Sequence, residues 1–305
     1  MGRVFIAGSI NMDVVATADR HPKVGETVAG KAVHYFPGGK GANQAVASAK
    51  LGAPTTLIGR LGTDAFGQQL RTFLAAQAID LTHVKDTAEA HTGTAIITVA
   101  DADNTIAVVP GANSLVSVED ISALALAKGD VAVSQFENPL PTIRAFFQRA
   151  RAAGVTTILN LAPAMMFGKD LLDLVDIVIL NETELGFLTG TELRDSEDPA
   201  RFVKAGKSLQ GGGRIICVTL GKRGVLALID GAVSTIAGRA VKAVDATSAG
   251  DCFVGALASQ LAGGTSIRNA LEYANAAASI CVQRLGAAPS MPTAAEVNQA
   301  ISTRS

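Results

Sequence analysis

The sequence of 305 residues has few charged residues, few cysteines and no strongly basic segment. Its 26 Lys and Arg residues nearly balance 27 Asp and Glu residues, which leaves a net charge of −1, and no run of Lys and Arg is longer than two residues. A protein that binds nucleic acid normally carries a basic face, so we expect neither a nucleic-acid nor a membrane partner. Charged residues make up 17% and hydrophobic residues 48% of the chain, which is typical of a large buried core and not of a disordered chain.

The three cysteines, Cys217, Cys252 and Cys281, are far apart and lie among small or aliphatic residues. Their odd number argues against a disulfide framework, and their spacing argues against a zinc site. We therefore expect buried, reduced thiols and a cytoplasmic location. Residues 1–15 are apolar, but this segment is too short and too polar for a signal peptide or a membrane span.

Short apolar runs alternate with helix-like segments along most of the chain. Strands are predicted for residues 4–7, 55–58, 131–134, 157–160, 177–180, 215–219 and 225–229. Helices are predicted for residues 41–51, 66–78, 140–153, 183–188, 200–210, 251–261 and 266–285. Such alternation predicts an α/β fold in which a mostly parallel sheet is covered by helices on both faces. We expect residues 1–305 to form one such domain.

Two β-rich segments, at about residues 14–36 and 94–110, interrupt this alternation. The first contains prolines and glycines and has no helical period, whereas the second holds two β-rich runs separated by Ala-Asp-Ala-Asp, a pattern typical of a hairpin. Two such excursions from one edge of the core are expected to pair into a small sheet. A sheet that projects over the strand ends would form a lid.

The loop after the first predicted strand, residues 8–13, has the sequence GSINMD. Ligands of open parallel sheets bind outside the carboxyl ends of the strands. The loop lacks the GxGxxG pattern, which argues against a dinucleotide-binding turn and an NAD-dependent oxidoreductase. Asn11 and Asp13 point the same way if the chain is extended, and both suit vicinal hydroxyl groups. Both residue types are also common in plain turns, and that interpretation stays open.

A glycine-rich segment, PGGKGANQ at residues 37–44, precedes a predicted helix. Glycines permit a positive φ and close approach of the backbone, and a helix N-terminus attracts anions. The segment is not a Walker A loop, because Lys40 is followed by glycine and not by Ser or Thr. A simple turn would explain the glycines, but Lys40 and Asn43 add polar groups that a turn does not need.

The segment DATSAGDCF, residues 245–253, runs into another apolar helix. Consecutive backbone N–H groups at a helix start form an anion hole suited to a transferring phosphoryl group. Asp251 lies in the first turn, where its carboxylate can accept a proton from a hydroxyl. An ordinary acidic residue that complements the helix dipole is the alternative. Cys252, beside it, is interpreted as packing, since no histidine accompanies it.

Taken in this order, the motifs GSINMD, PGGKGANQA and the DxTxAGD-type segment resemble those of the ribokinase (phosphofructokinase-B type) family of sugar kinases. Segments QFENP at 135–139, NLAP at 160–163, NETE at 181–184 and TLGKRG at 219–224 also resemble family segments. The similarity covers nearly the whole chain. It implies a ribokinase-like three-layer α/β/α sandwich with a small β-sheet lid. It also implies ATP-dependent phosphorylation of a sugar hydroxyl, with D-ribose converted to D-ribose 5-phosphate as the favoured reaction.

The resemblance implies roles for individual residues. Asp251 would be the general base, and the backbone of Ala249, Gly250 and Asp251 would form the anion hole. Sugar binding is assigned to Asn11, Asp13, Gly39, Lys40, Asn43, Glu137 and Asp251. Nucleotide binding is assigned to Asn181, Glu184, Thr219, Gly221, Gly224, Gly250 and Asn275. Asn181 and Glu184 match the family's NxxE motif, which organises the Mg²⁺ that accompanies ATP.

The family also suggests a monovalent-cation site, usually for K⁺, behind the anion hole. The matching positions are Asp245, Thr247, Cys281, Arg284, Gly286 and Ser290, several of which would act through backbone carbonyls. A buried cation there would order the loop that supplies the anion hole. Cys281 and Arg284 also fit plain helix-end residues. A homodimer that pairs two lids is a further implication of the resemblance.

The chain departs from a common family form of the last motif, DTTGAGD, at two positions. Ala246 and Ser248 stand where that form has Thr and Gly, and the Ser248 hydroxyl is a candidate phosphate contact. Gly250 and Asp251 are retained. The alternatives are a kinase for 2-deoxyribose, fructose, adenosine or pseudouridine, and a non-catalytic sugar or nucleotide sensor. A degraded base would mark a sensor, so the retained Asp251 favours an enzyme.

Overall fold

The computed structural model describes residues 1–305 except 102, 194–195, 197 and 304–305. Within the described residues the main element is a nine-stranded sheet with the order β13-β12-β11-β10-β9-β8-β1-β4-β5. Its strands are β1 (Val4–Ala7), β4 (Thr55–Gly62), β5 (Asp80–Thr87), β8 (Val131–Gln135), β9 (Thr156–Asn160), β10 (Ile177–Asn181), β11 (Ile215–Thr219), β12 (Gly224–Ile229) and β13 (Ala232–Ala237). Neighbouring strands from β5 to β11 are parallel. β12 is antiparallel to both of its neighbours, β11 and β13. The predicted mostly parallel sheet is confirmed.

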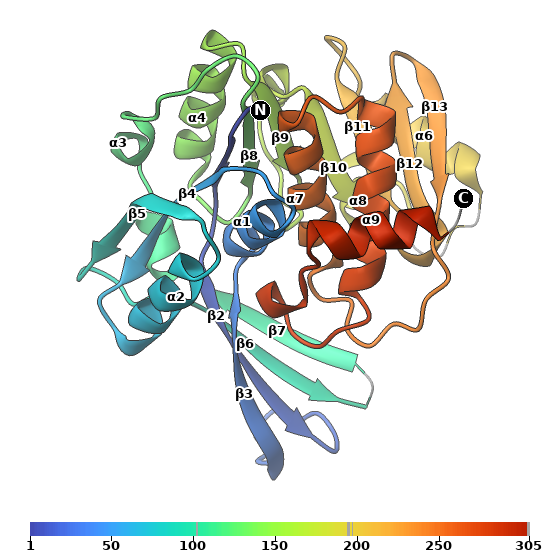
Figure 1. Cartoon of the computed structure of the whole chain (residues 1–305). Coiled ribbons are helices and arrows are strands. Elements are labelled where there is room, and N and C mark those ends of the chain that lie inside the picture. The colour runs from blue at the N-terminus through green and yellow to red at the C-terminus, as the bar shows by residue number, and fades with distance from the viewer. Residues whose placement is uncertain (102, 194–195, 197, 304–305) are drawn as a thin grey trace.

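Helices cover both faces of this sheet (Figure 1). One layer contains α1 (Lys40–Lys50), α2 (Ala65–Ala75), α7 (Ala249–Ala262), α8 (Ile267–Cys281) and α9 (Ala294–Ser302). The other contains α3 (Val118–Ile121), α4 (Leu140–Ala152), α5 (Glu182–Thr189) and α6 (Pro199–Lys207). Val4 and Ile6 pack in the first core, and Phe5 and Ala7 pack in the second. This alternation follows from the two-residue period of a strand, and it confirms the three-layer sandwich.

A second, smaller sheet projects from one end of the main sheet (Figure 1). It contains β2 (Asn11–Ala18), β3 (Gly30–Gly38), β6 (Gly93–Ala100) and β7 (Asp103–Val109), in the order β3-β2-β6-β7. β2 and β6 are parallel, and the other two pairs are antiparallel. Asn11 is paired with both Gly38 and Gly93. We call this row, Gly38–Asn11–Gly93, the base row, because the small sheet joins the main body there.

Several predicted boundaries are wrong. The helix predicted for 266–285 ends at Cys281, because the Val282 carbonyl accepts the N–H groups of Val244 and Asp245, and Gly286 then takes a φ of 88°. The helix predicted to start at 251 starts at Ala249. The helices predicted to end at 78 and 210 end at Ala75 and Lys207. Strands β5 and β13 and helix α9 were not predicted.

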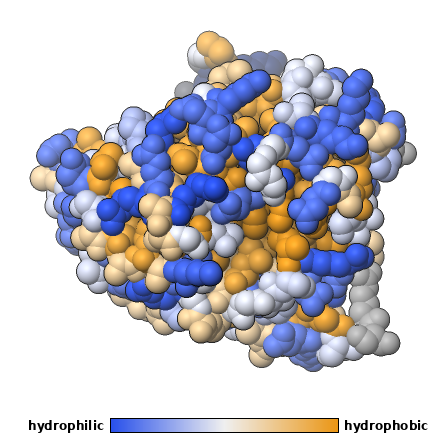
Figure 2. Space-filling model, turned by 90° about the horizontal axis from the view of Figure 1, so that it is seen from above, coloured by the Kyte–Doolittle hydropathy of each residue, from blue (hydrophilic) through white to orange (hydrophobic). Residues whose placement is uncertain are grey.

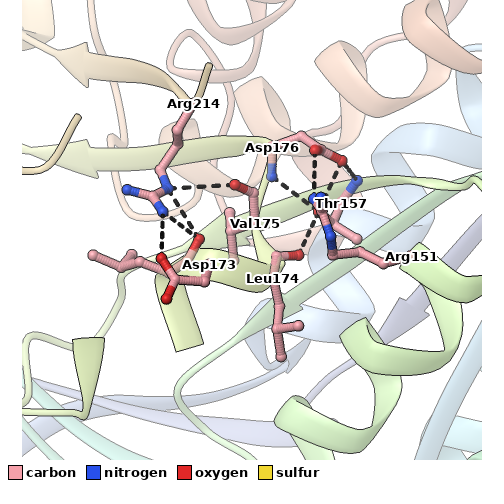
Figure 3. Close-up of polar contacts among 8 residues, drawn as sticks. Arg151, Thr157, Asp173, Leu174, Val175, Asp176 and Arg214 are labelled. Atoms are coloured by element: carbon pink, nitrogen blue, oxygen red, sulfur yellow. Dashed lines mark hydrogen bonds and ion pairs between the residues drawn. The ribbon is translucent and has the colours of Figure 1, made fainter. Parts of the chain in front are cut away.

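Polar groups at the amino ends of β9–β11 are paired with one another, as Figure 3 shows. Arg214 precedes β11, is only 7% exposed, and its guanidinium donates to backbone carbonyls of Leu172, Val175 and Leu209. The Asp176 carboxylate accepts from Thr157 N at 2.8 Å and Thr157 Oγ1 at 3.0 Å, and it pairs with Arg151 at 2.9 Å. We call the side chains of Arg151, Thr157, Asp176 and Arg214 the amino-end network.

Figure 2 views the molecule from the end opposite the small sheet, and hydrophilic and hydrophobic residues intermingle over that face. None of the helices in the described part of the chain combines the length and the hydropathy that a bilayer crossing requires.

Candidate active site

A cleft of about 690 Å³ opens at the carboxyl ends of β9, β10 and β11, beside the start of α7. Every residue to which the sequence analysis assigned nucleotide binding lines it: Asn181, Glu184, Thr219, Gly221, Gly224, Gly250 and Asn275. Lys40, Thr247, Ala249 and Asp251 contribute to the same wall. The strand order reverses between β1 and β8, because the chain proceeds from β1 to β4 on one side and to β8 on the other. Ligands of open α/β sheets bind at such a switch point.

The first turn of α7 presents the backbone N–H groups of Gly250 and Asp251 to this cleft. The helix begins at Ala249 with no side-chain cap. Ala249 N donates to Ala246 O at 3.2 Å and Cys252 N donates to Ser248 O at 2.9 Å, so the N–H groups between them, of Gly250 and Asp251, are the ones left without a backbone acceptor. The N–H groups at the first positions of a helix have no acceptor within it. A Cβ built on Gly250 would meet no atom within 4 Å. The absence of a side chain at Gly250 therefore leaves the backbone open to an anion.

Asp251 is a buried carboxylate in that turn, held by two amide side chains of α1. Asn43 Nδ2 donates to its Oδ2 at 3.0 Å, and Gln44 Nε2 donates to its Oδ1 at 2.9 Å. The side chain is 7% exposed and still lines the cleft. Two fixed donors restrict the rotation of the carboxylate, as a proton acceptor for a bound hydroxyl requires.

Lys40, at the start of α1, lies among four carboxylates. Burial lowers the pKa of Lys40, but the negative charges of Asp251, Glu137, Glu184 and Asp13 outweigh this effect and raise the pKa above its ordinary value. The lysine is therefore a permanent positive charge in the wall of the cleft.

Asp13 and Asn11 follow β1 on the small sheet. Burial, followed by the charges of Glu137 and Asp251, raises the pKa of Asp13 from 3.8 to about 7, although Lys40 opposes the shift. Asn11 Oδ1 accepts from Asn113 Nδ2 at 2.7 Å. Both residues are buried, and they share a sheet face because they are two positions apart. The geometry agrees with the expectation that they point the same way.

Glu137 follows β8 and accepts a hydrogen bond from the Ser9 hydroxyl. The end of β8 thus lies next to the loop after β1. Glu137 contributes to the raised pKa values of both Asp13 and Lys40, so the structure brings it together with the other residues assigned to the sugar.

The backbone of the 37–44 segment itself requires glycine at two positions. Gly39 has a φ of 89°, and a Cβ there would lie 2.6 Å from Asn11 N. A Cβ on Gly41 would lie 2.4 Å from Gly8 C. The interpretation as a tight glycine-rich turn is therefore correct for the glycines, while Lys40 and Asn43 carry the polar groups toward Asp251.

Asn181 and Glu184 form a capping box at the start of α5. Asn181 Oδ1 accepts from Glu184 N at 2.8 Å, and Glu184 Oε2 accepts from Asn181 N at 2.7 Å. Burial raises the pKa of Glu184. The NxxE spacing thus has a local structural cause, and it also fixes one carboxylate at the cleft wall.

Five of the six residues matched to a cation site gather behind the start of α7. Asp245 accepts from Thr247 N at 2.9 Å and Gly286 N at 3.1 Å, and Cys281 Sγ lies 3.0 Å from Ser290 Oγ. The sixth, Arg284, directs its guanidinium to Glu296. The Ser248 hydroxyl is buried and bonds Ala287 O at 3.3 Å, which is away from the cleft, so its expected phosphate contact is wrong.

Four amide residues near the site were not singled out by the sequence analysis: Gln44, Asn113, Gln135 and Asn160. All are buried. Gln44, Gln135 and Asn160 belong to the segments PGGKGANQA, QFENP and NLAP, but these segments gave their amides no role, because the three side chains meet only in the folded chain. Cys252 is fully buried, and burial raises its pKa well above the ordinary value, which agrees with the packing interpretation.

A helix start with free N–H groups beside a cleft, and a buried carboxylate in its first turn, are features that phosphoryl transfer by positioning and charge stabilisation would use. The family model described as pfkB family carbohydrate kinase matches residues 1–294. The chain belongs to the pfkB family of carbohydrate kinases, which confirms the resemblance seen in its motifs.

The relatives within that family include several ribokinases. The chain is 39% identical to a ribokinase from Staphylococcus aureus, over 97% of this chain and 99% of that protein. It is 36% identical to a Bacillus subtilis ribokinase, over 99% and 100%. A structure of Arabidopsis thaliana ribokinase complexed with ribose and ATP has a TM-score of 0.89 and 33% identity, and covers 99% of each chain. A Vibrio cholerae fructokinase with bound fructose and ADP has a TM-score of 0.80 and 25% identity, over 98% of each chain.

Proposed function

We propose that this protein transfers the γ-phosphoryl group of ATP to D-ribose and yields D-ribose 5-phosphate, with Asp251 as the general base. The observation that carries the proposal is the position of Asp251. Its carboxylate lines the cleft beside the start of α7 and is bonded to Asn43 of the glycine-rich segment. It therefore joins the expected nucleotide residues to the expected sugar residues. Ribokinases at 36–39% identity support ribose as the acceptor.

In this proposal the Asp251 carboxylate accepts the proton of the sugar hydroxyl as the oxygen attacks the γ-phosphorus. The backbone of residues 249–251 stabilises the charge on the transferring group, through the N–H groups of Gly250 and Asp251, since that of Ala249 donates to Ala246 O. Lys40 adds a permanent positive charge nearby. Phosphoryl transfer needs alignment and charge neutralisation more than covalent help, and these groups supply both.

Sugar recognition is proposed for Asn11, Asp13, Gly39, Lys40, Asn43, Glu137 and Asp251. Asn43 Oδ1 is buried with no hydrogen-bond partner in the protein, which suits contact with a sugar hydroxyl. Gly39 would contribute through its backbone, since a side chain does not fit there.

Nucleotide binding is proposed for Asn181, Glu184, Thr219, Gly221, Gly224, Gly250 and Asn275, and Mg²⁺ is proposed to accompany ATP. Four carboxylates surround one lysine, so a polyphosphate needs a further positive charge. Mg²⁺ often uses one or two carboxylates together with substrate phosphates, and Glu184 offers such an oxygen at the cleft wall. When bound, Mg²⁺ would neutralise phosphate charge.

A monovalent cation, K⁺ by resemblance, is proposed behind the anion hole at Asp245, Thr247, Cys281, Arg284, Gly286 and Ser290. The Asp245 carboxylate and the hydroxyls of Thr247 and Ser290 are hard oxygen donors that suit such an ion. Arg284 would contribute only through its backbone, since its side chain pairs with Glu296. A cation here would add rigidity to residues 245–251.

We further propose that the small sheet is a lid and that two lids pair in a homodimer. The cross-strand row Phe36–Asp13–Ala95–Val108 places Asp13 on the sheet face toward the site. Ile106 and Val108 on the edge strand β7 are 51% and 48% exposed, and an exposed apolar edge strand favours pairing with another chain. A cytoplasmic location is proposed from the free thiols.

The test is ADP release with ATP·Mg²⁺ and a panel of ribose, 2-deoxyribose, fructose, adenosine and pseudouridine, in K⁺ or in Na⁺. Turnover on ribose that K⁺ raises and that Asp251→Asn lowers by about 10²-fold or more is the expected result. Preferred turnover of fructose would favour the alternative suggested by the fructokinase likeness. Binding of ATP and ribose without turnover would instead indicate a sensor.

A further inference from the structure

Gln44 occupies a fully buried position between Asp251 and the central sheet. Its Nε2 donates to Asp251 Oδ1 at 2.9 Å and to Asn160 Oδ1 at 3.2 Å, while its Oε1 accepts from Gln135 Nε2. The side chain is 0% exposed and does not line the cleft. Gln44 therefore touches the carboxylate from the core side, opposite to the ligands.

The direction of this amide is fixed by a backbone carbonyl. Asn160 Nδ2 donates to Ile179 O at 3.2 Å, and a carbonyl oxygen only accepts. Asn160 must then present its Oδ1 to Gln44, so Gln44 must present its Nε2. A flipped Gln44 would place its oxygen against two acceptors, Asn160 Oδ1 and Asp251 Oδ1. The chain Ile179–Asn160–Gln44 therefore delivers an N–H to Asp251.

We propose that Gln44 is the residue that positions Asp251 for proton abstraction, and this proposal rests on the proposed kinase function. Asn43 and Gln44 hold opposite oxygens of the carboxylate. Asn43 is also a proposed sugar ligand, so its bond to Oδ2 is exchangeable when sugar binds. Gln44 has no access to ligand and retains Oδ1 throughout. Oδ2 is consequently the oxygen that receives the sugar proton.

The decisive measurement is a double-mutant cycle of Gln44→Met with Asp251→Asn, read as kcat and KM. A hydrogen bond to a charged group contributes enough that Gln44→Met should lower kcat by about 10- to 100-fold, with KM for ATP changed less than about threefold. Residues that act as a unit are non-additive. The double variant should therefore be no slower than Asp251→Asn alone. A kcat within twofold of wild type, or effects that multiply, would overturn the proposal.

Ser48→Ala is the matched control, because Ser48 is buried in the same helix and bonds Thr55 Oγ1 at 2.8 Å. It should lower thermal stability and leave kcat unchanged. If Gln44→Met does not fold, Gln135→Met removes the donor to Gln44 Oε1 one step further away, and a several-fold loss of kcat is expected. An unchanged kcat would count against the proposal.

A second readout separates this proposal from the kinase function. Crystal structures of the wild type and Gln44→Met should show the Asp251 carboxylate turned about its side-chain torsions in the variant. This comparison needs no substrate. If no sugar is phosphorylated, the proposed function fails while the positioning role is still tested, and an unmoved carboxylate would reject that role.

Discussion

The two ends of the central sheet use similar residues in opposite ways. At the amino end, Arg214 and Asp176 form hydrogen bonds with the protein's own backbone and side chains (Figure 3). At the carboxyl end, Asp13 lies near other carboxylates, and the buried Asn43 Oδ1 and the amide atoms of Asn138 have no partner in the protein. Buried polar groups are normally paired. The comparison teaches that one end is completed by folding, while the other retains polar groups that suit a ligand.

The largest expected contrast is between two carboxylates at opposite ends. Asp251→Asn should lower kcat by about 10²–10⁴, because it removes the proton acceptor. Asp176→Asn should leave kcat unchanged and reduce stability, since Asp176 serves only the amino-end network. Steady-state kinetics and thermal unfolding of both variants measure this contrast. Equal losses of kcat would show that the two ends are not functionally distinct.

Substitution of a glycine at the carboxyl end should lower kcat without lowering the melting temperature. Gly250→Ala is expected to lower kcat by on the order of 10²–10³, because the added methyl group obstructs the anion hole. No protein atom lies within 4 Å of that Cβ, so the melting temperature should hold or rise slightly. Gly255→Ala is the contrast, because its Cβ would lie 2.4 Å from Gln44 O and should destabilise the fold. Normal kinetics for Gly250→Ala would remove the anion hole from the mechanism.

At the amino end the reverse is expected: substitutions should reduce stability and leave kcat unchanged. Arg214→Leu removes the guanidinium that donates to the Val175 and Leu209 carbonyls and to Leu172 O, which keeps the Val175 N–H. It should cost about 2–4 kcal/mol of unfolding free energy. Arg151→Leu, whose ion pair is about half exposed, should cost less than about 1 kcal/mol. Denaturant unfolding gives both values, and kcat of the folded variants should match the wild type. A similar cost for both substitutions would contradict the burial argument.

A further expected effect, on stability alone, is a pH dependence from Asp13. Its pKa of about 7 in the folded state lies above the ordinary 3.8, so the folded protein holds an extra proton between these values. Stability should therefore fall as pH rises through this window, by at most about 1.4 kcal/mol per unit from this group. Glu184 contributes in the same direction. Asp13→Asn should flatten the curve measured by denaturant unfolding, and parallel curves for the two proteins would argue against the shift.

Much of the carboxyl end could be predicted from sequence, because its chemistry is encoded in short motifs. PGGKGANQA and the turn before α7 carry their glycines, lysine and aspartate within a few residues. The amide chain behind Asp251 could not be predicted, since Gln44, Gln135 and Asn160 meet only when α1, β8 and β9 pack together. The Arg214 contacts were missed for the same reason.

Local patterns also fail where tertiary contacts decide an element. β5 and β13 complete the two edges of the sheet, and their half-exposed residues lack the apolar run by which the inner strands were found. Arg284 was matched to a cation site by its position, but its side chain turns to Glu296. A position along the chain predicts a backbone location more securely than a side-chain direction.

The base row gives the small sheet the mechanics of a lever. Three strands start or end at Gly38, Asn11 and Gly93, and the sheet extends from there along β2, whose eight residues span about 26 Å at ~3.3 Å per residue. A rotation of about 10° at the fulcrum would displace the far tip by about 4–5 Å, by the same length. Asn11 is both part of this fulcrum and a proposed sugar ligand. A rotation of the small sheet about Asn11 would therefore couple a small change beside the proposed sugar site to a displacement of several ångströms at the far tip over that length.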